Sequence, residues 1–392
     1  MKLGIFDKYK TTLGQVDHVK KTLSNNKPAA INFEIDLTNG CNHRCSFCQW
    51  GSWIQSNRAT LDSKIVIRTL PELIKHGTKA ITWTGGGEPT VHKDFFKLLN
   101  LSYKLGLDNG LLTNGSLLKK ENNEQLLKQL IFLRISMAGG NREAYKKVQG
   151  RDDFDLVIDN LSRIGERKKQ MKSKTTLGVA FLANRENADS LEDFVDILIN
   201  SNCDYLQVRR DNYIKEAERK WWSDNIGKKC QELAKYSKKK GMGILTEGYV
   251  TFQKYVDYPK KCYAHNFVMT INAEGNVVFC KNTRDNPLFY IGSLYKKTFT
   301  QIWKNSKIKK DLEKNIKPAN CATFCKNMQI NKAIEDLINN KDIYFPSNLG
   351  TNDKLITLLN RASRTLCDWF SKADKNGPLP FDESFNCIMP EE

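Results

Sequence analysis

Three cysteines stand close together in the run Cys41-Asn42-His43-Arg44-Cys45-Ser46-Phe47-Cys48, directly after the apolar stretch Ile31 to Leu37. The C-x3-C-x2-C spacing places their thiols on one short loop at the end of an expected strand. Three thiolates can bind three irons of a cubane cluster and leave the fourth iron open to a small molecule. Zinc is the alternative metal, with His43 as fourth ligand, although zinc sites usually pair their ligands as two C-x2-C units.

The composition is typical of a globular protein from a reducing compartment. The chain has 392 residues, 40% hydrophobic and 27% charged, enough for one large core and a smaller one. Its start lacks an apolar h-region and no run reaches membrane-spanning length, so we expect a cytoplasmic protein without membrane association. Its 11 cysteines, without a secretion signal, favour thiolate ligands over disulfides.

The net charge of +18 indicates acidic partners. A basic surface favours phosphates, nucleotides, nucleic acid or acidic peptides. Lysines outnumber arginines, however, and are scattered among many asparagines, as expected for a general residue bias. Nucleic acid is therefore a secondary candidate that the sequence does not exclude, because phosphate readers favour the arginine fork.

Strand-like runs alternate with helical patterns between residues 31 and 245. The expected strands are Ile31–Leu37, Ala80–Thr84, Gly110–Thr113, Leu133–Ser136, Thr176–Leu182 and Asp204–Val208. The expected helices include Ser63–His76, Lys93–Lys104, Asp153–Lys169 and Ser190–Asn200. This alternation predicts an α/β fold, with a parallel sheet curled into a partial (β/α)6 TIM-like barrel. Ligand chemistry in such barrels lies at the carboxyl ends of the strands.

The pattern changes after a long basic helix expected at Trp221–Gly241. Two short strands, Phe267–Ile271 and Val277–Cys280, flank a turn in which Gly275 suits a positive φ. Further helices are expected at Thr298–Lys310 and Asn327–Asn339. We therefore expect an N-terminal extension (1–30), the barrel (31–245), a small α+β domain (246–340) and a C-terminal tail (341–392).

A glycine-rich motif, Thr84-Gly85-Gly86-Gly87-Glu88-Pro89, follows the second expected strand. Glycines let a backbone approach a ligand closely, so backbone groups and Glu88 could hold an ammonium. This motif and the cysteine loop together resemble the signature of the radical S-adenosylmethionine (SAM) superfamily. The resemblance implies a [4Fe–4S] cluster on Cys41, Cys45 and Cys48, with SAM at its open iron.

The same resemblance implies contacts to SAM. Phe47 would pack near the adenine ring, and Gly86, Gly87, Glu88 and Pro89 would bind the amino group of the methionyl part. Further contacts are implied for Asn114 in the turn Thr113-Asn114-Gly115, for Ser136 at a strand end, and for Arg151 on the SAM carboxylate. The related pattern usually has arginine at the position of Gln149, so Arg151 is a substitute. Ser136 as a strand-end cap and Arg151 as a solvated surface residue are the alternatives.

A second group of cysteines comprises Cys262, Cys280, Cys321 and Cys325. Between Cys262 and Gly275 lie 12 residues, and between Gly275 and Cys280 lie four. This resembles the C-x9-15-G-x4-C opening of SPASM and twitch domains, and implies a second, auxiliary [4Fe–4S] cluster whose irons all have thiolate ligands. The C-x2-C-x5-C of the full SPASM pattern is missing, so the chain resembles the shorter, one-cluster twitch version.

Other cysteines have no assigned chemistry. Cys203 and Cys230 are expected in the core. Cys367 and Cys387, in the tail, are extra ligands, a catalytic pair or buried thiols. The sequence indicates no catalytic residue and no oligomeric state.

The resemblance implies an oxidoreductase-type enzyme that cleaves SAM reductively to a 5′-deoxyadenosyl radical and removes a hydrogen atom from substrate. Flavodoxin or ferredoxin would donate the electron, and the auxiliary cluster would accept one. Only 40 residues precede Cys41, too few for a leader-peptide-binding domain, which favours a small polar substrate such as a sugar, aminocyclitol or nucleotide-linked sugar. A peptide-modifying maturase remains an alternative. A basic metal-binding module that docks nucleic acid is the alternative of another class.

Overall fold

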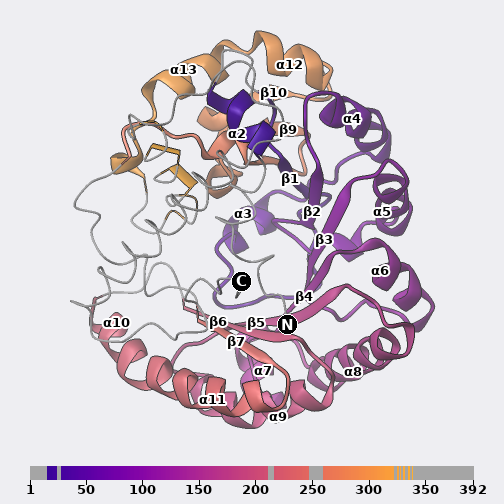
Figure 1. Cartoon of the computed structure of the whole chain (residues 1–392), viewed down its shortest axis with the longest axis vertical. Helices are drawn as coiled ribbons and strands as arrows, with labels where there is room; N and C mark the ends of the chain where they lie inside the picture. The colour runs from indigo at the N-terminus through magenta and orange to yellow at the C-terminus, as the bar shows by residue number, and fades with distance from the viewer. Residues whose placement is uncertain are drawn as a thin grey trace, which may run out of the picture.

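The computed structural model describes residues 16–23, 28–210, 216–246 and 259–321, together with 325, 327, 330–331, 334–335 and 338. Within these residues, ten strands form one sheet in the order β10-β9-β8-β1-β2-β3-β4-β5-β6-β7. The sheet curves, and helices lie along its outer side (Figure 1). None of the described helices combines the length and hydropathy needed to cross a bilayer.

Consecutive parallel strands build the barrel. They are β1 (Asn32–Asp36), β2 (Ala80–Thr84), β3 (Asp108–Thr113), β4 (Phe132–Ser136), β5 (Thr176–Leu182), β6 (Tyr205–Arg209) and β7 (Gly243–Thr246). Each pairs in parallel with the next. The expected partial TIM-like barrel is confirmed, with β7 as an additional strand beyond the six expected.

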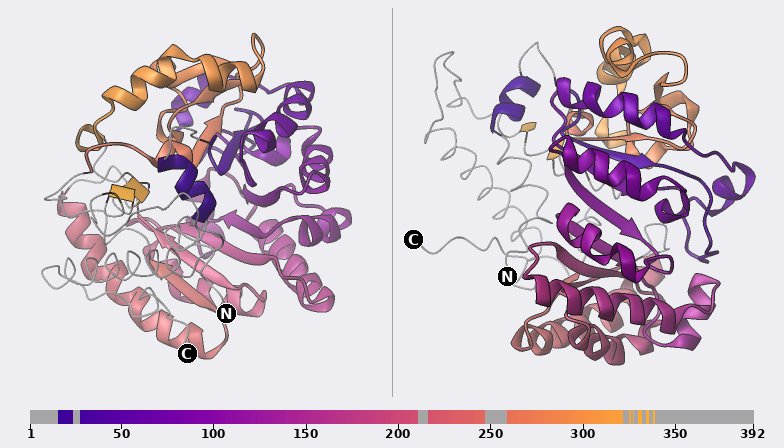
Figure 2. Two further views of the ribbon diagram at one scale, coloured as in Figure 1. Left: turned by 45° about the horizontal axis from the view of Figure 1, so that its top comes forward. Right: turned by 90° about the vertical axis from the view of Figure 1, so that its right-hand side faces the viewer.

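Helices cover the outside of the barrel. They are α4 (Ser63–Lys75), α5 (Phe95–Lys104), α6 (Asn123–Gln129), α7 (Arg142–Gln149), α8 (Phe154–Met171), α9 (Leu191–Asn200), α10 (Glu216–Trp222) and α11 (Lys228–Lys239). The short helix α3 (Gly51–Ser56), which follows the cysteine loop, lies inside the ring of helices in the view of Figure 1. Helix α4 begins where Asp62 accepts a hydrogen bond from the Lys64 N–H, and it buries Val66, Leu70 and Leu73. The helices lie one beside another along the outer face (Figure 2).

Side chains alternate between the two faces of each barrel strand. On β1, Phe33 packs edge-on against Phe299, with ring centroids 5.6 Å apart, and Ile35 also belongs to the helix-covered core. Burial of each such side chain stabilises the fold by about 1.5–3 kcal/mol. Glu34 and Asp36 therefore face the concave side, so this inner face is polar.

The C-terminal strands extend the barrel sheet instead of forming a sheet of their own. They are β8 (Val268–Ile271), β9 (Asn276–Val278) and β10 (Tyr290–Ser293). Strand β8 pairs in parallel with β1 and antiparallel with β9. Gly275 has φ 74° in the β8–β9 turn, the conformation expected there.

Three expected segments differ from the structure. Residues 1–30 contain a helix, α2 (Val16–Leu23), where no unit was expected. The helix expected at Trp221–Gly241 begins at Glu216 and is interrupted by a π turn, Ser223–Gly227. The helix expected at Thr298–Lys310 is two helices, α12 (Phe299–Asn305) and α13 (Lys307–Asn315), because Ser306 ends one and caps the next.

Other expectations fall beyond the described residues. The helix expected at Asn327–Asn339 is described only in part, and the segment from 339 to the C-terminus, with Cys367 and Cys387, lies outside the described ranges.

Candidate cofactor sites

The cysteine loop continues directly from the carboxyl end of β1. Cys41, Cys45 and Cys48 are partly buried. Burial, with a smaller contribution from the neighbouring Cys48 thiol, raises the pKa of Cys41 to about 11 and that of Cys45 to about 12. The three thiols therefore lie close enough to interact. They would lose their protons on binding a metal, since thiolates are the ligating form.

The glycine-rich loop packs directly against the segment before Cys41. The N–H of Gly87 donates to the Thr38 carbonyl at 3.1 Å, and the N–H of Glu88 donates to the Gly40 carbonyl at 2.9 Å. A Cβ atom at Gly87 would lie 2.1 Å from the Gly40 oxygen, so no larger residue fits there. The two motifs, some 40 residues apart in sequence, thus form one site at the ends of β1 and β2.

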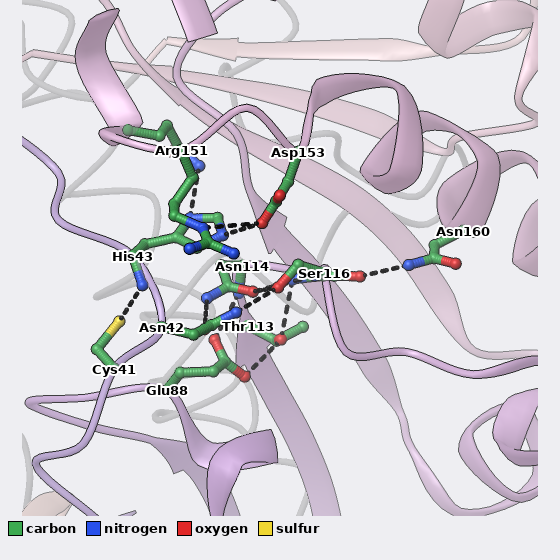
Figure 3. Close-up of polar contacts among 12 residues, drawn as sticks. Cys41, Asn42, His43, Glu88, Thr113, Asn114, Ser116, Arg151, Asp153 and Asn160 are labelled. Atoms are coloured by element: carbon green, nitrogen blue, oxygen red, sulfur yellow. Dashed lines mark hydrogen bonds and ion pairs between the residues drawn. The ribbon is translucent and has the colours of Figure 1, made fainter. Parts of the chain in front are cut away.

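Glu88 holds the ends of β2 and β3 together (Figure 3). Its carboxylate accepts four hydrogen bonds, from the Thr90 N–H and hydroxyl, the Thr113 hydroxyl and the Asn114 N–H, at 2.6–3.0 Å. Burial raises the pKa of Glu88, whereas these hydrogen bonds lower it. Three of these bonds end on Oε1 and one on Oε2, so Oε2 keeps an acceptor position while Oε1 is fully used within the protein. We therefore expect Glu88 to hold the loop in shape for SAM, and its direct contact with the ammonium stays a prediction.

Asn114 connects the third strand end to the cysteine loop. Its side-chain N–H donates to the Asn42 side-chain oxygen at 2.8 Å, and Asn42 donates to the Ser116 hydroxyl at 2.8 Å (Figure 3). Ser116 completes the triangle by donating to Asn114 at 2.8 Å. Sequence reasoning missed Asn42 and Ser116. The sequence offered only their positions, since Asn42 follows Cys41 and Ser116 follows the Thr113-Asn114-Gly115 turn.

His43 faces away from a metal site. Its Nδ1 lies 3.4 Å from the Gln149 amide nitrogen, and its Nε2 lies 3.3 Å from the Asp153 carboxylate. Burial lowers the pKa of His43, while Asp153 raises it. The zinc alternative with His43 as ligand therefore has no geometric support.

Arg151 lies on the outer side of this loop. Its side chain is half exposed, and its Nε donates to Asp153 at 3.5 Å (Figure 3). Gln149, which occupies the usual arginine position, is buried and accepts a hydrogen bond from the Ala138 N–H at 3.2 Å. The role of Arg151 on the SAM carboxylate stays a prediction.

Two polar side chains near the glycine-rich loop remain available to a ligand. Asn39 is fully buried, and neither its amide oxygen nor its nitrogen has a hydrogen-bond partner in the described part of the chain. Its oxygen would lie 2.9 Å from a Cβ atom at Gly86, so it packs directly against the glycine-rich loop. Ser136 ends β4 and is partly exposed. The unused donor and acceptor of the Asn39 amide are of the kind that could bind the zwitterionic methionyl group of SAM.

The second group of cysteines also assembles. Cys262 precedes β8, Cys280 follows β9, and Cys321 and Cys325 follow α13. Burial, with a smaller contribution from the Cys325 thiol, raises the pKa of Cys262 to about 11, of Cys280 to about 12 and of Cys321 to about 11. All four thiols are therefore neighbours. This ligand set fits a cubane cluster with no open iron.

Two family models match the segments that contain the two groups of cysteines. The model of the radical SAM superfamily matches residues 35–208, and that of SPASM, an iron–sulfur cluster-binding domain, matches residues 262–327. A probable GTP 3′,8-cyclase of Saccharolobus solfataricus is 27% identical over 180 residues, which cover 44% of this chain and 54% of that protein. The chain thus matches about half the length of its curated relatives.

Solved structures share the fold. SuiB of Streptococcus suis bound to S-adenosylmethionine superposes with a TM-score of 0.59 at 18% identity, over 84% of this chain and 80% of SuiB. The structure of anSMEcpe with bound AdoMet gives a TM-score of 0.55 at 15% identity, over 88% of this chain and 99% of that chain. The chain belongs to the radical SAM superfamily, with a [4Fe–4S] cluster and SAM as cofactors and a C-terminal SPASM iron–sulfur domain.

Proposed function

We propose that this protein is an oxidising radical SAM enzyme that removes a hydrogen atom from a small polar substrate held inside the barrel. Sugars, aminocyclitols and nucleotide-linked sugars are the substrate class we favour. The observation that carries the proposal is the polar inner face of the barrel, where Glu34, Asp36, Arg134 and Gln207 lie on β1, β4 and β6. Polyols need hydrogen-bonding groups of this kind.

When bound, the cluster and SAM supply the radical chemistry, and the protein supplies position and electrostatics. Cys41, Cys45 and Cys48 would hold the cluster on its loop. Glu88 and Asn114 keep that loop fixed on the ends of β2 and β3. Preorganisation of this kind keeps the reacting atoms in line without further conformational cost.

The auxiliary site supports a net oxidation. Its four cysteines would occupy every iron, which leaves no position for substrate and suits electron transfer. Lys281 and Arg284, just after Cys280, contact Glu34 and Asp36 on the inner face of the barrel. Only a few residue contacts therefore separate the barrel interior from the auxiliary site, which suits electron transfer between them.

Peptide modification is the second candidate. SuiB bound to its precursor peptide SuiA has the same fold, with a TM-score of 0.59 at 17% identity over 83% of this chain and 78% of SuiB. The relatives named as probable GTP 3′,8-cyclases support the nucleotide class instead. The basic surface is compatible with either substrate, because both nucleotides and acidic peptides are anionic.

Turnover assays separate the candidates. Reconstituted enzyme is incubated anaerobically with SAM and either dithionite or reduced flavodoxin, the type of donor that we expect. GTP, sugar nucleotides and aminocyclitols form one panel, and peptides encoded by neighbouring genes form the other. We expect 5′-deoxyadenosine in proportion to oxidised product from the first panel. Coupled turnover only with a peptide would contradict the proposal.

A further inference from the structure

Arg134 lies on the inner face of the barrel. On β4 its neighbours Leu133 and Ile135 belong to the helix-covered core, so alternation turns Arg134 to the concave side. It lies two residues before Ser136, about 7 Å deeper along the strand. The residue beside it on β5 is Gly178, over which the Tyr205 ring of β6 packs.

The Arg134 side chain reaches past β5 to β6. Its Nη1 donates to the Gln207 side-chain oxygen at 2.8 Å. Its Nε is shielded from solvent and has no hydrogen-bond partner in the described part of the chain. The described residues also provide no carboxylate for this guanidinium. The edge formed by Nε and Nη2 is therefore unused.

The carboxylates of Glu34 and Asp36, on β1, already pair with cations of the protein. Arg284 donates from Nη1 to both Asp36 oxygens at 2.9 and 3.0 Å, and from Nη2 to Glu34 at 2.8 Å. Lys281 contacts the other Glu34 oxygen at 3.3 Å. The two carboxylates are therefore balanced by the two cations Arg284 and Lys281. Neither carboxylate offsets the positive charge of Arg134 on the inner face.

Arg134 is partly exposed, but its Nε donor is shielded from water without a hydrogen-bond partner, which is unfavourable for a buried polar group. The free Nε–Nη2 edge presents two parallel N–H donors, which match two oxygens of a carboxylate or phosphate. A bound oxyanion would satisfy the Nε donor and neutralise the charge together.

We propose that Arg134, held in place by Gln207, binds an oxyanion of the substrate inside the barrel. The inference rests on the proposed function, in that the substrate occupies this interior. It restricts the substrate class to molecules that carry a phosphate or a carboxylate, and it excludes uncharged sugars.

Equilibrium dialysis of the reconstituted enzyme with SAM tests this inference, using inorganic phosphate and succinate as probes at constant ionic strength. The variants are Arg134→Gln, Arg134→Lys and, as a matched control, Arg167→Gln. Arg167 is exposed on α8 and pairs with Glu124, so its loss changes the net charge equally without touching the barrel interior. Iron content and circular dichroism check that each variant is folded.

We expect saturable binding to wild type and Arg167→Gln, and affinity weaker by roughly tenfold or more in Arg134→Gln. Arg134→Lys keeps the charge but loses the fork, so its affinity should be intermediate, and it provides the comparison if Arg134→Gln does not fold. Preference for phosphate indicates a phosphorylated substrate, and preference for succinate a carboxylate. Equal affinity in all variants, or no saturable binding to wild type, overturns the inference.

SAM cleavage with dithionite is measured on the same preparations. Oxyanion binding without any SAM cleavage contradicts the proposed function alone. SAM cleavage without oxyanion binding contradicts the Arg134 inference alone.

Discussion

Buried polar side chains shape the candidate SAM site around the cysteines. Glu88 accepts hydrogen bonds from residues on two strand ends, and Asn114 carries the connection on to Asn42, beside Cys41. A buried polar group without partners is expensive, so such a hydrogen-bonded network specifies one loop conformation. The network links the third strand to both motifs.

Glu88→Gln should weaken SAM binding. The new amide nitrogen would face donors such as the Thr113 hydroxyl or the Asn114 N–H, which costs about 1–3 kcal/mol for an unmatched buried group. We expect the Kd for SAM to rise by about tenfold, with unchanged iron content, as measured by equilibrium binding. Glu124→Gln, at an exposed site, is the control. An unchanged Kd in Glu88→Gln would mean that the network does not shape the site.

Cys45→Ala should abolish SAM cleavage, because two thiolates should no longer retain the cubane. Cys203→Ala is the matched control, since Cys203 is buried in the barrel core, away from both cysteine groups. The readout is 5′-deoxyadenosine formed with dithionite. Cleavage retained in Cys45→Ala would refute the assignment of this loop.

At the scale of single residues, the sequence identifies site residues that lie close to one another in the chain. The cysteines and the glycine-rich motif are recognisable because each lies within one short run. Asn42 and Ser116 were missed, because they are 74 residues apart and meet only in the folded chain. Asn39 was missed for a similar reason, because only the folded structure shows that its side chain is buried beside Gly86.

Elements with strong periodicity were predicted well. Strands β2 (Ala80–Thr84) and β5 (Thr176–Leu182) have the expected bounds, because apolar runs flanked by turn residues leave few alternatives. Strand β7 was missed because four residues after a basic helix carry little pattern. The pairing of β8 with β1 was also not predicted, since it joins segments more than 200 residues apart.

Helix α2 docks on the C-terminal part of the sheet through His18. Its Nε2 donates to the Asn266 carbonyl at 2.6 Å, and its ring packs edge-on against Phe267 at 5.4 Å. Burial lowers the pKa of His18, and Lys79 and Lys21 lower it further. The folded state thus binds the proton less tightly than the unfolded state.

Acidification should therefore weaken the docking of α2. For a lowered histidine pKa, stability is complete above the unfolded value of about 6.5 and is lost as the pH falls below it. His18→Gln keeps a donor but does not titrate, so the loss in melting temperature from pH 7.5 to about 5.5 should be smaller in this variant. An identical loss in both proteins would show that His18 is not responsible.

The whole molecule is connected across its two cofactor sites by one buried ion-pair network. Arg284, four residues after Cys280, binds Asp36 on β1 and lies over the Trp50 ring, 5.2 Å from its centroid. Asp36 also accepts a hydrogen bond from the Gly86 backbone, and burial raises its pKa to about 7 while Arg284 opposes that rise. The network therefore contacts the segments that follow Cys48, precede Glu88 and follow Cys280.

Arg284→Met should destabilise the fold by about 3–5 kcal/mol, because it leaves Asp36 and Glu34 buried with less compensation. The double variant Asp36→Asn, Arg284→Met should recover part of this loss, since one charge no longer needs a partner. Urea unfolding followed by tryptophan fluorescence measures both, with exposed Arg167→Gln as control. A midpoint for Arg284→Met equal to that of wild type would contradict the role of the network.

Iron and sulfide per chain in anaerobically reconstituted protein test the central claim of two clusters on two groups of cysteines. We expect about eight irons and eight sulfides in wild type, from two cubanes. Cys280→Ala should retain about four irons and still cleave SAM, since only the auxiliary site is affected. About four irons in wild type, or zinc in place of iron, would contradict the account.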